Sequence, residues 1–404
     1  MISFFKKNKI LLGIILFSFV LRLATNFFLQ GTSAPLLGDS LAYETLGKNL
    51  IQGKGYVLPG IGQTAYRLPL LPMLIAFLYK LFGMHEFIIR IFISLLDSLL
   101  VGGIFLLGKK IYSQNTGLFA GLIYAVSPFA IGECLHISTE VLFTLILFSF
   151  TSYLIFNQNK LDIKKIFFAG ALLGLATMTR AASLYLIVFI IPAIFISTKN
   201  KNQALQFILC LNLGFILVCS PWIIRNSIVF DKTALGGTGS GEVLLGSYNP
   251  DVFEDGRKSG TWFYGKKTES YPVTQDEFKR DLAMKKAALG YFKKYWYKLP
   301  LHELNKLKYF WNFIPNLAEK VTWPKALLGF VFFGIFLPFF IWGLRDIKRA
   351  PLIYLWTVIL YFNILALLTY GSIRMRFPIN PYIYIISCNY MLVFFKQIFS
   401  KKRL

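Results

Sequence analysis

Long apolar runs recur along the whole chain and are separated by short polar segments. Several of these runs approach the ~20 residues that a helix needs to cross the hydrocarbon core of a bilayer. A spanning segment must be helical, because an open strand or loop leaves its backbone polar groups unsatisfied in lipid. We therefore predict an all-α integral membrane protein with about ten transmembrane helices, near residues 10–28, 87–107, 116–131, 141–156, 166–178, 183–196, 205–222, 326–343, 352–370 and 382–395.

The distribution of Lys and Arg gives these spans a direction. Short loops rich in Lys and Arg stay on the cytoplasmic side of a membrane. With ten spans, both termini are cytoplasmic and the basic residues of the inner segments share that side: Lys6, Lys7, Lys9, Lys109, Lys110, Lys160, Lys164, Lys165, Lys199, Lys201, Arg345, Lys348, Arg349, Lys396, Lys401, Lys402 and Arg403. A weaker apolar run at residues 68–81 would reverse this arrangement if it were a span, so we predict an interfacial helix there.

This layout divides the chain into three parts. Residues 1–222 are predicted to form a transmembrane domain with a first outer loop, at about residues 30–85, that carries catalytic groups. Residues 223–324 are predicted to form a larger extracytoplasmic loop with amphipathic helices, and residues 325–404 the C-terminal transmembrane helices. Within the large loop, Thr274 and Glu277 have the spacing of a capping box at the start of a helix.

Composition agrees with a protein of the plasma or inner membrane, since 56% of the residues are hydrophobic and only 15% are charged. The formal net charge of +24 would suit a nucleic-acid partner. However, the inner segments account for much of it, so we expect membrane lipids and no nucleic acid as partners. No cysteine or histidine motif for a metal is present, although Glu133, His136 and Glu140 share a helical face that leaves a divalent cation open as an alternative.

The remaining polar residues of interest all fall on the predicted outer side. Asp39 follows the first span, where its carboxylate is suited to act as a general base or, alternatively, to cap the next helix. Arginines near the outer ends of spans are suited to clamp a phosphate through a planar fork of donors, or else to snorkel to the interface. They are Arg22, Arg90, Arg180, Arg374 and Arg376. Asp97, within a span, is interpreted as a structural partner for Arg90 or for a neighbouring span.

In order and in sidedness, these residues resemble those of the polytopic GT-C class of glycosyltransferases, in the branch of protein mannosyltransferases and aminoarabinose transferases. The resemblance is carried by Arg22, Asp39, Tyr43, Gly53-Lys-Gly55-Tyr56, Arg67-x-Pro69-x-x-Pro72, Pro128, Thr139-Glu140, Thr179-Arg180, Ser220-Pro221-Trp222-x-x-Arg225-Asn226 and Arg374-Met-Arg376-Phe-Pro378-x-x-Pro381. Many relatives have an acidic pair in the first outer loop, whereas Gly38 and Ser40 flank Asp39 here, which disfavours a metal site at that point.

The resemblance implies a sugar donor linked to polyprenyl phosphate and an acceptor hydroxyl on a lipid, glycan or protein. Asp39 would be the base of an inverting transfer, and Arg67, Arg374 and Arg376 would bind the donor phosphate, with no cofactor required. Further candidates near the cavity are Tyr43, Glu140, Arg180 and Arg90. A polytopic transporter or flippase of a lipid-linked or anionic substrate is the alternative, but transporters favour internal repeats and polar groups at mid-depth, and the chain shows no convincing repeat.

Overall fold

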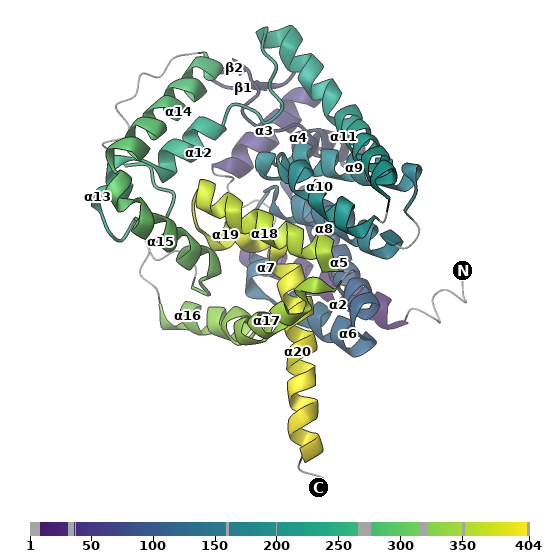
Figure 1. The fold of residues 1–404 in the computed structure, drawn as a ribbon. Coiled ribbons are helices and arrows are strands. Elements are labelled where there is room, and N and C mark those ends of the chain that lie inside the picture. The colour runs from purple at the N-terminus through teal and green to yellow at the C-terminus, as the bar shows by residue number, and fades with distance from the viewer. Residues whose placement is uncertain are drawn as a thin grey trace.

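A computed structural model of the chain describes residues 9–30, 36, 38–158, 161–198, 200–265, 276–314, 322–349 and 352–401. Several predictions fall on residues outside these ranges, namely those for Lys6, Lys7, Lys160, Lys199, Lys402, Arg403 and Thr274. The described part is predominantly helical, as predicted, and a single two-stranded hairpin is its only sheet (Figure 1).

The membrane body is a bundle of apolar helices. They are α2 (Lys9–Gln30), α5 (Glu86–Ile111), α6 (Gln114–Ala125), α7 (Pro128–Glu133), α8 (Glu140–Asn157), α9 (Ile163–Thr179), α10 (Leu186–Ser197), α11 (Lys201–Phe230), α16 (Trp323–Gly329), α17 (Leu337–Gly343), α18 (Ile353–Leu368), α19 (Ile373–Arg376) and α20 (Asn380–Lys401). Short 3-10 helices join some of them: η2 (Ala181–Ser183), η5 (Leu344–Lys348) and η7 (Phe377–Ile379). Between α16 and α17 lies the π-helical segment η4 (Phe330–Gly334).

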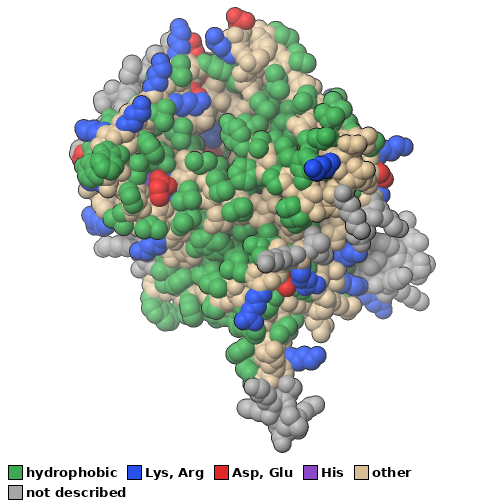
Figure 2. All heavy atoms as spheres, viewed as in Figure 1, with side chains coloured by type: hydrophobic (Ala, Val, Ile, Leu, Met, Phe, Trp, Pro, Cys, Tyr) green, Lys and Arg blue, Asp and Glu red, His purple; other side chains and the backbone are tan. Residues whose placement is uncertain are grey.

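Among the described residues, six helices are long and apolar enough to cross a bilayer: Lys9–Leu29, Glu86–Ile111, Glu140–Asn157, Lys201–Phe230, Trp323–Ile347 and Ile373–Phe399. Three shorter apolar helices are Leu70–Phe82, Ala181–Ser197 and Ile353–Leu368. The chain is thus a multi-pass membrane protein, and its exact number of spans stays a prediction. Hydrophobic side chains are spread over much of the visible face in Figure 2, as expected of a surface that faces lipid.

Glycines allow the closest helix contact in the body, between α9 and α11. A Cβ added to Gly170 would collide with the carbonyl oxygen of Leu211, and one added to Gly214 would collide with the carbonyl oxygen of Phe167. Small residues at such a crossing let two backbones approach, which favours van der Waals packing where lipid provides no hydrophobic driving force. The long α11 is thereby held against α9, and its C-terminal end extends beyond α9 towards the loop that follows it.

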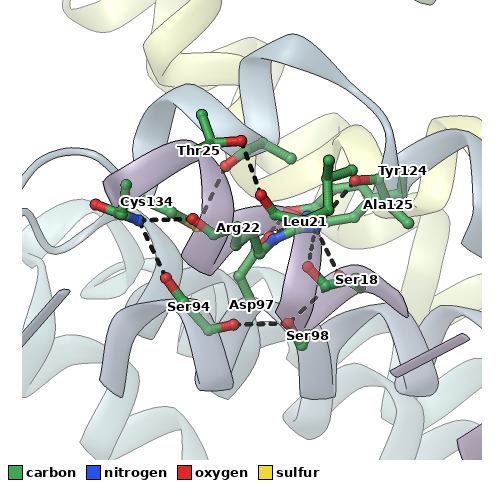
Figure 3. A network of polar contacts seen from close by, with 12 residues as sticks. Ser18, Leu21, Arg22, Thr25, Ser94, Asp97, Ser98, Tyr124, Ala125 and Cys134 are labelled. Carbon is green, nitrogen blue, oxygen red and sulfur yellow. Dashed lines mark hydrogen bonds and ion pairs between the residues drawn. The ribbon is translucent and has the colours of Figure 1, made fainter. Parts of the chain in front are cut away.

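A buried polar network ties α2, α5 and α6 together (Figure 3). The Arg22 Nε donates to Asp97 Oδ2 at 2.5 Å, and the Tyr124 hydroxyl donates to Asp97 Oδ1 at 2.9 Å. Arg22 also donates to the Ser18 hydroxyl at 2.6 Å and to the Ala125 carbonyl at 2.9 Å. Arg22 therefore does not snorkel to the interface, and Asp97 pairs with a neighbouring span rather than with Arg90.

The first outer loop folds into two packed helices and the hairpin. Helix α3 (Asp39–Ile51) packs on α4 (Leu70–Phe82), and strands β1 (Val57–Leu58) and β2 (Gly62–Gln63) pair antiparallel between them. The Tyr79 hydroxyl of α4 donates to Glu44 of α3 at 2.6 Å. Helix α4 coincides with the apolar run at 68–81 that predicts an interfacial helix.

The predicted large outer loop forms a lobe at the left of Figure 1, called the outer lobe after that prediction, and this lobe has its own small core. It contains α12 (Ser240–Ser247), α13 (Pro250–Glu254), α14 (Glu277–Lys294), η3 (Trp296–Lys298) and α15 (Leu299–Trp311). Its buried core residues are Leu245, Tyr248, Phe253, Ala288 and Tyr295. The predicted capping box is wrong, because Asp276 is the N-cap of α14 and accepts from the backbone N–H groups of Phe278 and Lys279. Glu277 therefore does not cap this helix, and its carboxylate is available for other contacts.

Candidate active site

Five charged residues from four separate parts of the chain form one connected series. Asp39 accepts from Arg67 Nη2 at 2.5 Å and from Arg374 Nη2 at 3.1 Å. Arg374 also donates through its Nε to Glu140, whose same oxygen accepts from Arg180 Nη1 at 2.5 Å. The series alternates in sign and contains three arginines against two carboxylates, so it carries a formal excess of one positive charge. Such an excess favours binding of an anion.

Asp39 stands at the first position of α3, and its carboxylate points towards the arginines. Gly38, with φ of 56°, occupies the N-cap place of α3 and supplies no side chain. The alternative interpretation of Asp39 as a helix cap is therefore wrong. The Asp39 side chain keeps 34% of its exposure, so a ligand can reach the carboxylate. It is suited to take a proton from a hydroxyl that approaches this exposed part of the carboxylate.

Tyrosines surround the Arg67 guanidinium. Its central carbon lies 4.4 Å from the ring centroid of Tyr66 and 5.5 Å from that of Tyr43, which are cation–π distances. Burial raises the pKa of the Tyr43 and Tyr66 hydroxyls, so both phenols remain neutral at pH 7. The Tyr66 hydroxyl donates to Glu242 of α12 at 2.5 Å. Arg67 thus lies where the first outer loop meets the outer lobe.

The motif around Tyr56 fixes the backbone at Arg67. The Tyr56 hydroxyl donates to the carbonyl of Arg67 at 3.0 Å and lies within 3.2 Å of the next carbonyl, that of Leu68. Trp222 of α11 packs edge-on against the Tyr56 ring at 5.2 Å. Arg225, one turn further along α11, donates to the Thr64 carbonyl at 2.8 Å. The motifs that carry the family resemblance therefore meet physically around the segment that precedes Arg67.

Arg374 and Arg180 reach the site from the ends of membrane helices. The Ser372 hydroxyl caps α19 by accepting from the Met375 N–H, and this short turn presents Arg374 to Asp39 and Glu140. Arg180 lies directly after α9. Glu140, at the start of α8, is fully buried, whereas the Arg374 side chain is 45% exposed. Glu140 is therefore suited to orient the two arginines, and Arg374 to meet a ligand.

Two predicted residues lie apart from this series. Arg376 is fully buried, donates to the Phe310 and Asn312 carbonyls at 2.7 and 2.6 Å, and packs over the Phe333 ring. Arg376 joins α15 to α20, so the phosphate site proposed below does not include it. Arg90 pairs with Glu86 on its own helix at 3.7 Å.

Two tyrosines near the series were not assigned roles from the sequence, and Glu133 was named only in the divalent-cation alternative. Tyr66 stacks on Arg67, and Tyr370 lies within the electrostatic influence of Asp39, Glu140, Arg180 and Arg374. Burial, together with the nearby Glu140 carboxylate, raises the pKa of Glu133 to about 8. No motif spacing marks the two tyrosines, because the elements that carry them meet the charged series only in the folded chain.

The geometry offers no support for the divalent-cation alternative. Within the described ranges, no group of three or more His, Cys, Asp or Glu side chains is arranged to hold a metal. His136, one of the three residues of that alternative, is exposed. Independence from a metal stays a prediction.

The chain is a multi-pass helical body with a network of charged residues built partly from its predicted first outer loop. The comparisons confirm the resemblance predicted from the sequence. Residues 66–224 match the family described as dolichyl-phosphate-mannose-protein mannosyltransferase. No curated protein matches the sequence.

Solved structures match over nearly the whole chain. ArnT from Cupriavidus metallidurans bound to undecaprenyl phosphate aligns with a TM-score of 0.57 and 13% identity, covering 94% of this chain and 60% of that one. The archaeal oligosaccharyltransferase AglB from Archaeoglobus fulgidus, in complex with an inhibitory peptide and a dolichol-phosphate, aligns with a TM-score of 0.57 and 13% identity. That match covers 99% of this chain and 52% of AglB. At these identities the likeness establishes the shared membrane fold, and this chain spans little more than half the length of either protein.

Proposed function

We propose that the protein transfers a sugar from a polyprenyl-phosphate donor to an acceptor hydroxyl on the extracytoplasmic side of the membrane, with inversion at the anomeric carbon. The observation that carries the proposal is the position of Asp39 between the guanidinium groups of Arg67 and Arg374. A base and two phosphate ligands within one contact network are what such a transfer requires. The polyprenyl phosphates named with ArnT and AglB support the donor class.

In the proposed reaction, Asp39 accepts the proton of the acceptor hydroxyl as its oxygen attacks the anomeric carbon. The bond from that carbon to the phosphate oxygen breaks, and negative charge grows on the departing phosphate. Arg67 and Arg374 stabilise this charge through charge-assisted hydrogen bonds. Glu140 holds Arg374 in place, and Arg180 in turn holds Glu140.

The donor phosphate and the Asp39 carboxylate compete for the same two guanidinium groups. Binding of the phosphate between Arg67 and Arg374 therefore weakens their hold on Asp39. This exchange favours the reaction, because a carboxylate bound to two arginines is a poorer base than one that faces a hydroxyl. Donor binding would thus prepare the base for the acceptor.

Asp39→Asn tests the proposal directly. The asparagine keeps the shape of the side chain but cannot accept the proton, so sugar transfer should be abolished while the protein stays folded in membranes. Mass spectrometry of lipids, glycans and surface proteins from cells with and without the gene supplies the acceptor for the assay. Full transfer activity in the Asp39→Asn protein would overturn the assignment of the base.

The same variant has a second expected result. Because it removes the anion that competes with the phosphate, Asp39→Asn should bind polyprenyl phosphate at least as tightly as the wild type. The transporter alternative gains no comparable observation. Arg22 and Asp97, a charged pair within the body, are fully buried and pair with each other.

A further inference from the structure

Glu277 makes a contact that its position in the outer lobe does not suggest. Its carboxylate accepts from the Thr64 hydroxyl at 2.8 Å and from the Ala65 N–H at 2.6 Å, across more than 200 residues of sequence. All three residues are buried: Glu277 is 4% exposed, and Thr64 and Ala65 have no exposed surface. A charged acceptor with two donors inside a low-dielectric environment is among the stronger hydrogen-bonding arrangements in proteins.

The contact acts on the segment that leads into Arg67. The Tyr66 N–H donates to the Thr64 side-chain oxygen at 2.9 Å, and the Thr238 N–H donates to the Ala65 carbonyl at 3.3 Å. Tyr66 then carries the ring against which the Arg67 guanidinium rests. The first residue of α14 thus holds a short chain of bonds that ends at a ligand of the proposed phosphate site.

We propose that Glu277 is a positioning residue that fixes Arg67 for the donor phosphate by anchoring residues 64–66 to the outer lobe. The role rests on the proposed function, in which Arg67 binds that phosphate. Glu277 touches neither Arg67 nor Asp39 directly, so its effect passes through the backbone. The outer lobe is thereby connected to the donor side of the proposed site.

The chain provides a closely matched control on the next turn of the same helix. Asp281 accepts from the Gly241 N–H at 2.5 Å and from the Ser240 hydroxyl at 3.3 Å, so it too anchors α14 by one backbone and one hydroxyl donor. These two donors belong to α12, and Asp281 also pairs with Lys285 of its own helix, so all these contacts lie within the lobe. Asp281→Ala therefore loosens α14 without removing a contact to residues 64–66.

The experiment measures the affinity of the full-length protein in nanodiscs for a long-chain polyprenyl phosphate. Glu277→Ala should weaken that affinity about tenfold, the scale expected for hydrogen bonds to a charged group. Glu277→Gln should recover most of it, because an amide can accept from the Ala65 N–H and donate to Thr64. Asp281→Ala should change the affinity less than about twofold.

A double-mutant cycle distinguishes positioning from general damage. In an Arg67→Ala background, Glu277→Ala should have no further effect, because its influence passes through Arg67. An undiminished effect in that background, an equal effect of Asp281→Ala, or no effect of Glu277→Ala in the native background would each overturn the role.

Hydrogen exchange separates this role from the proposed function. Glu277→Ala, but not Asp281→Ala, should accelerate exchange of the amides of residues 64–68. If the wild type binds no polyprenyl phosphate, the proposed function fails. Hydrogen exchange alone then tests whether Glu277 anchors residues 64–66. Unchanged exchange rates of these amides in Glu277→Ala would overturn the anchoring role as well.

Discussion

Replacing Asp97 with leucine should strongly destabilise the membrane body, because it leaves Arg22 buried without its counter-ion. Both side chains have no exposed surface, and Asp97 is bound by Arg22 and by the Tyr124 hydroxyl. Arg22 would keep the Ser18 hydroxyl and the Ala125 carbonyl, which are neutral acceptors. Removing one partner of a buried ion pair costs about 3–5 kcal/mol, whereas replacing both with apolar side chains is often close to neutral.

The assay is reversible unfolding in mixed micelles with increasing SDS, followed by tryptophan fluorescence. Asp97→Leu should lower the free energy of unfolding by about 3–5 kcal/mol, and the double variant Arg22→Met/Asp97→Leu should regain most of this loss. Lys285→Ala, which removes the partly exposed Lys285–Asp281 pair, is the control and should cost less than about 1 kcal/mol. A loss below about 1 kcal/mol for Asp97→Leu, or a double variant that is as unstable as the sum of the single variants, would refute the reasoning.

Three further predictions address the site, the lobe and the topology. Arg374→Ala should reduce the transfer rate at saturating donor by about 10²–10³, the usual cost of losing one donor to a developing oxyanion, and Arg374→Lys should restore only part of it because lysine lacks the planar fork. His302 of α15 has its pKa lowered to about 3 by burial and by the charge of Lys306, so the unfolded state binds one more proton below pH 6.5 and stability falls as pH decreases. Thermal unfolding should show about 2 kcal/mol more loss between pH 6.5 and 5 in the wild type than in His302→Phe. Ser240→Cys should react with an impermeant thiol reagent added outside intact cells, and its protection there would overturn the extracytoplasmic placement of the lobe.

Much of the helical body could be predicted from the sequence, because an apolar run in lipid has one way to satisfy its backbone. Helix α2 begins and ends within two residues of the run at 10–28. The number of spans could not be fixed in this way. The run at 183–196 contains a break between η2 and α10, and the run at 116–131 divides into α6 and α7, so apolar length alone overstates what a single helix covers.

The site could be predicted as a set of residues on one side, but not as a network. Asp39, Arg67 and Arg374 meet as expected, whereas Arg376 does not. Arg374 and Arg376 are two residues apart on a helical turn, so their side chains point about 200° from one another. Only one of them can therefore face Asp39. No sequence pattern indicates which one, since the choice depends on the Phe310 and Asn312 carbonyls that bind Arg376. Hydrophobic periodicity likewise does not predict the contact between Glu277 and Thr64.

In the proposed transfer, the charges of the site would allow one set of arginines to serve both the base, Asp39, and the leaving phosphate. A sugar linked to polyprenyl phosphate carries one negative charge, which matches the excess of one positive charge in the series from Arg67 to Arg180. As the acceptor proton moves to Asp39, that carboxylate loses its charge and its claim on Arg67 and Arg374. At the same moment the departing phosphate gains charge. The electrostatic attraction released at Asp39 would therefore become available to the phosphate, so that proton transfer and bond cleavage would assist one another in the proposed reaction.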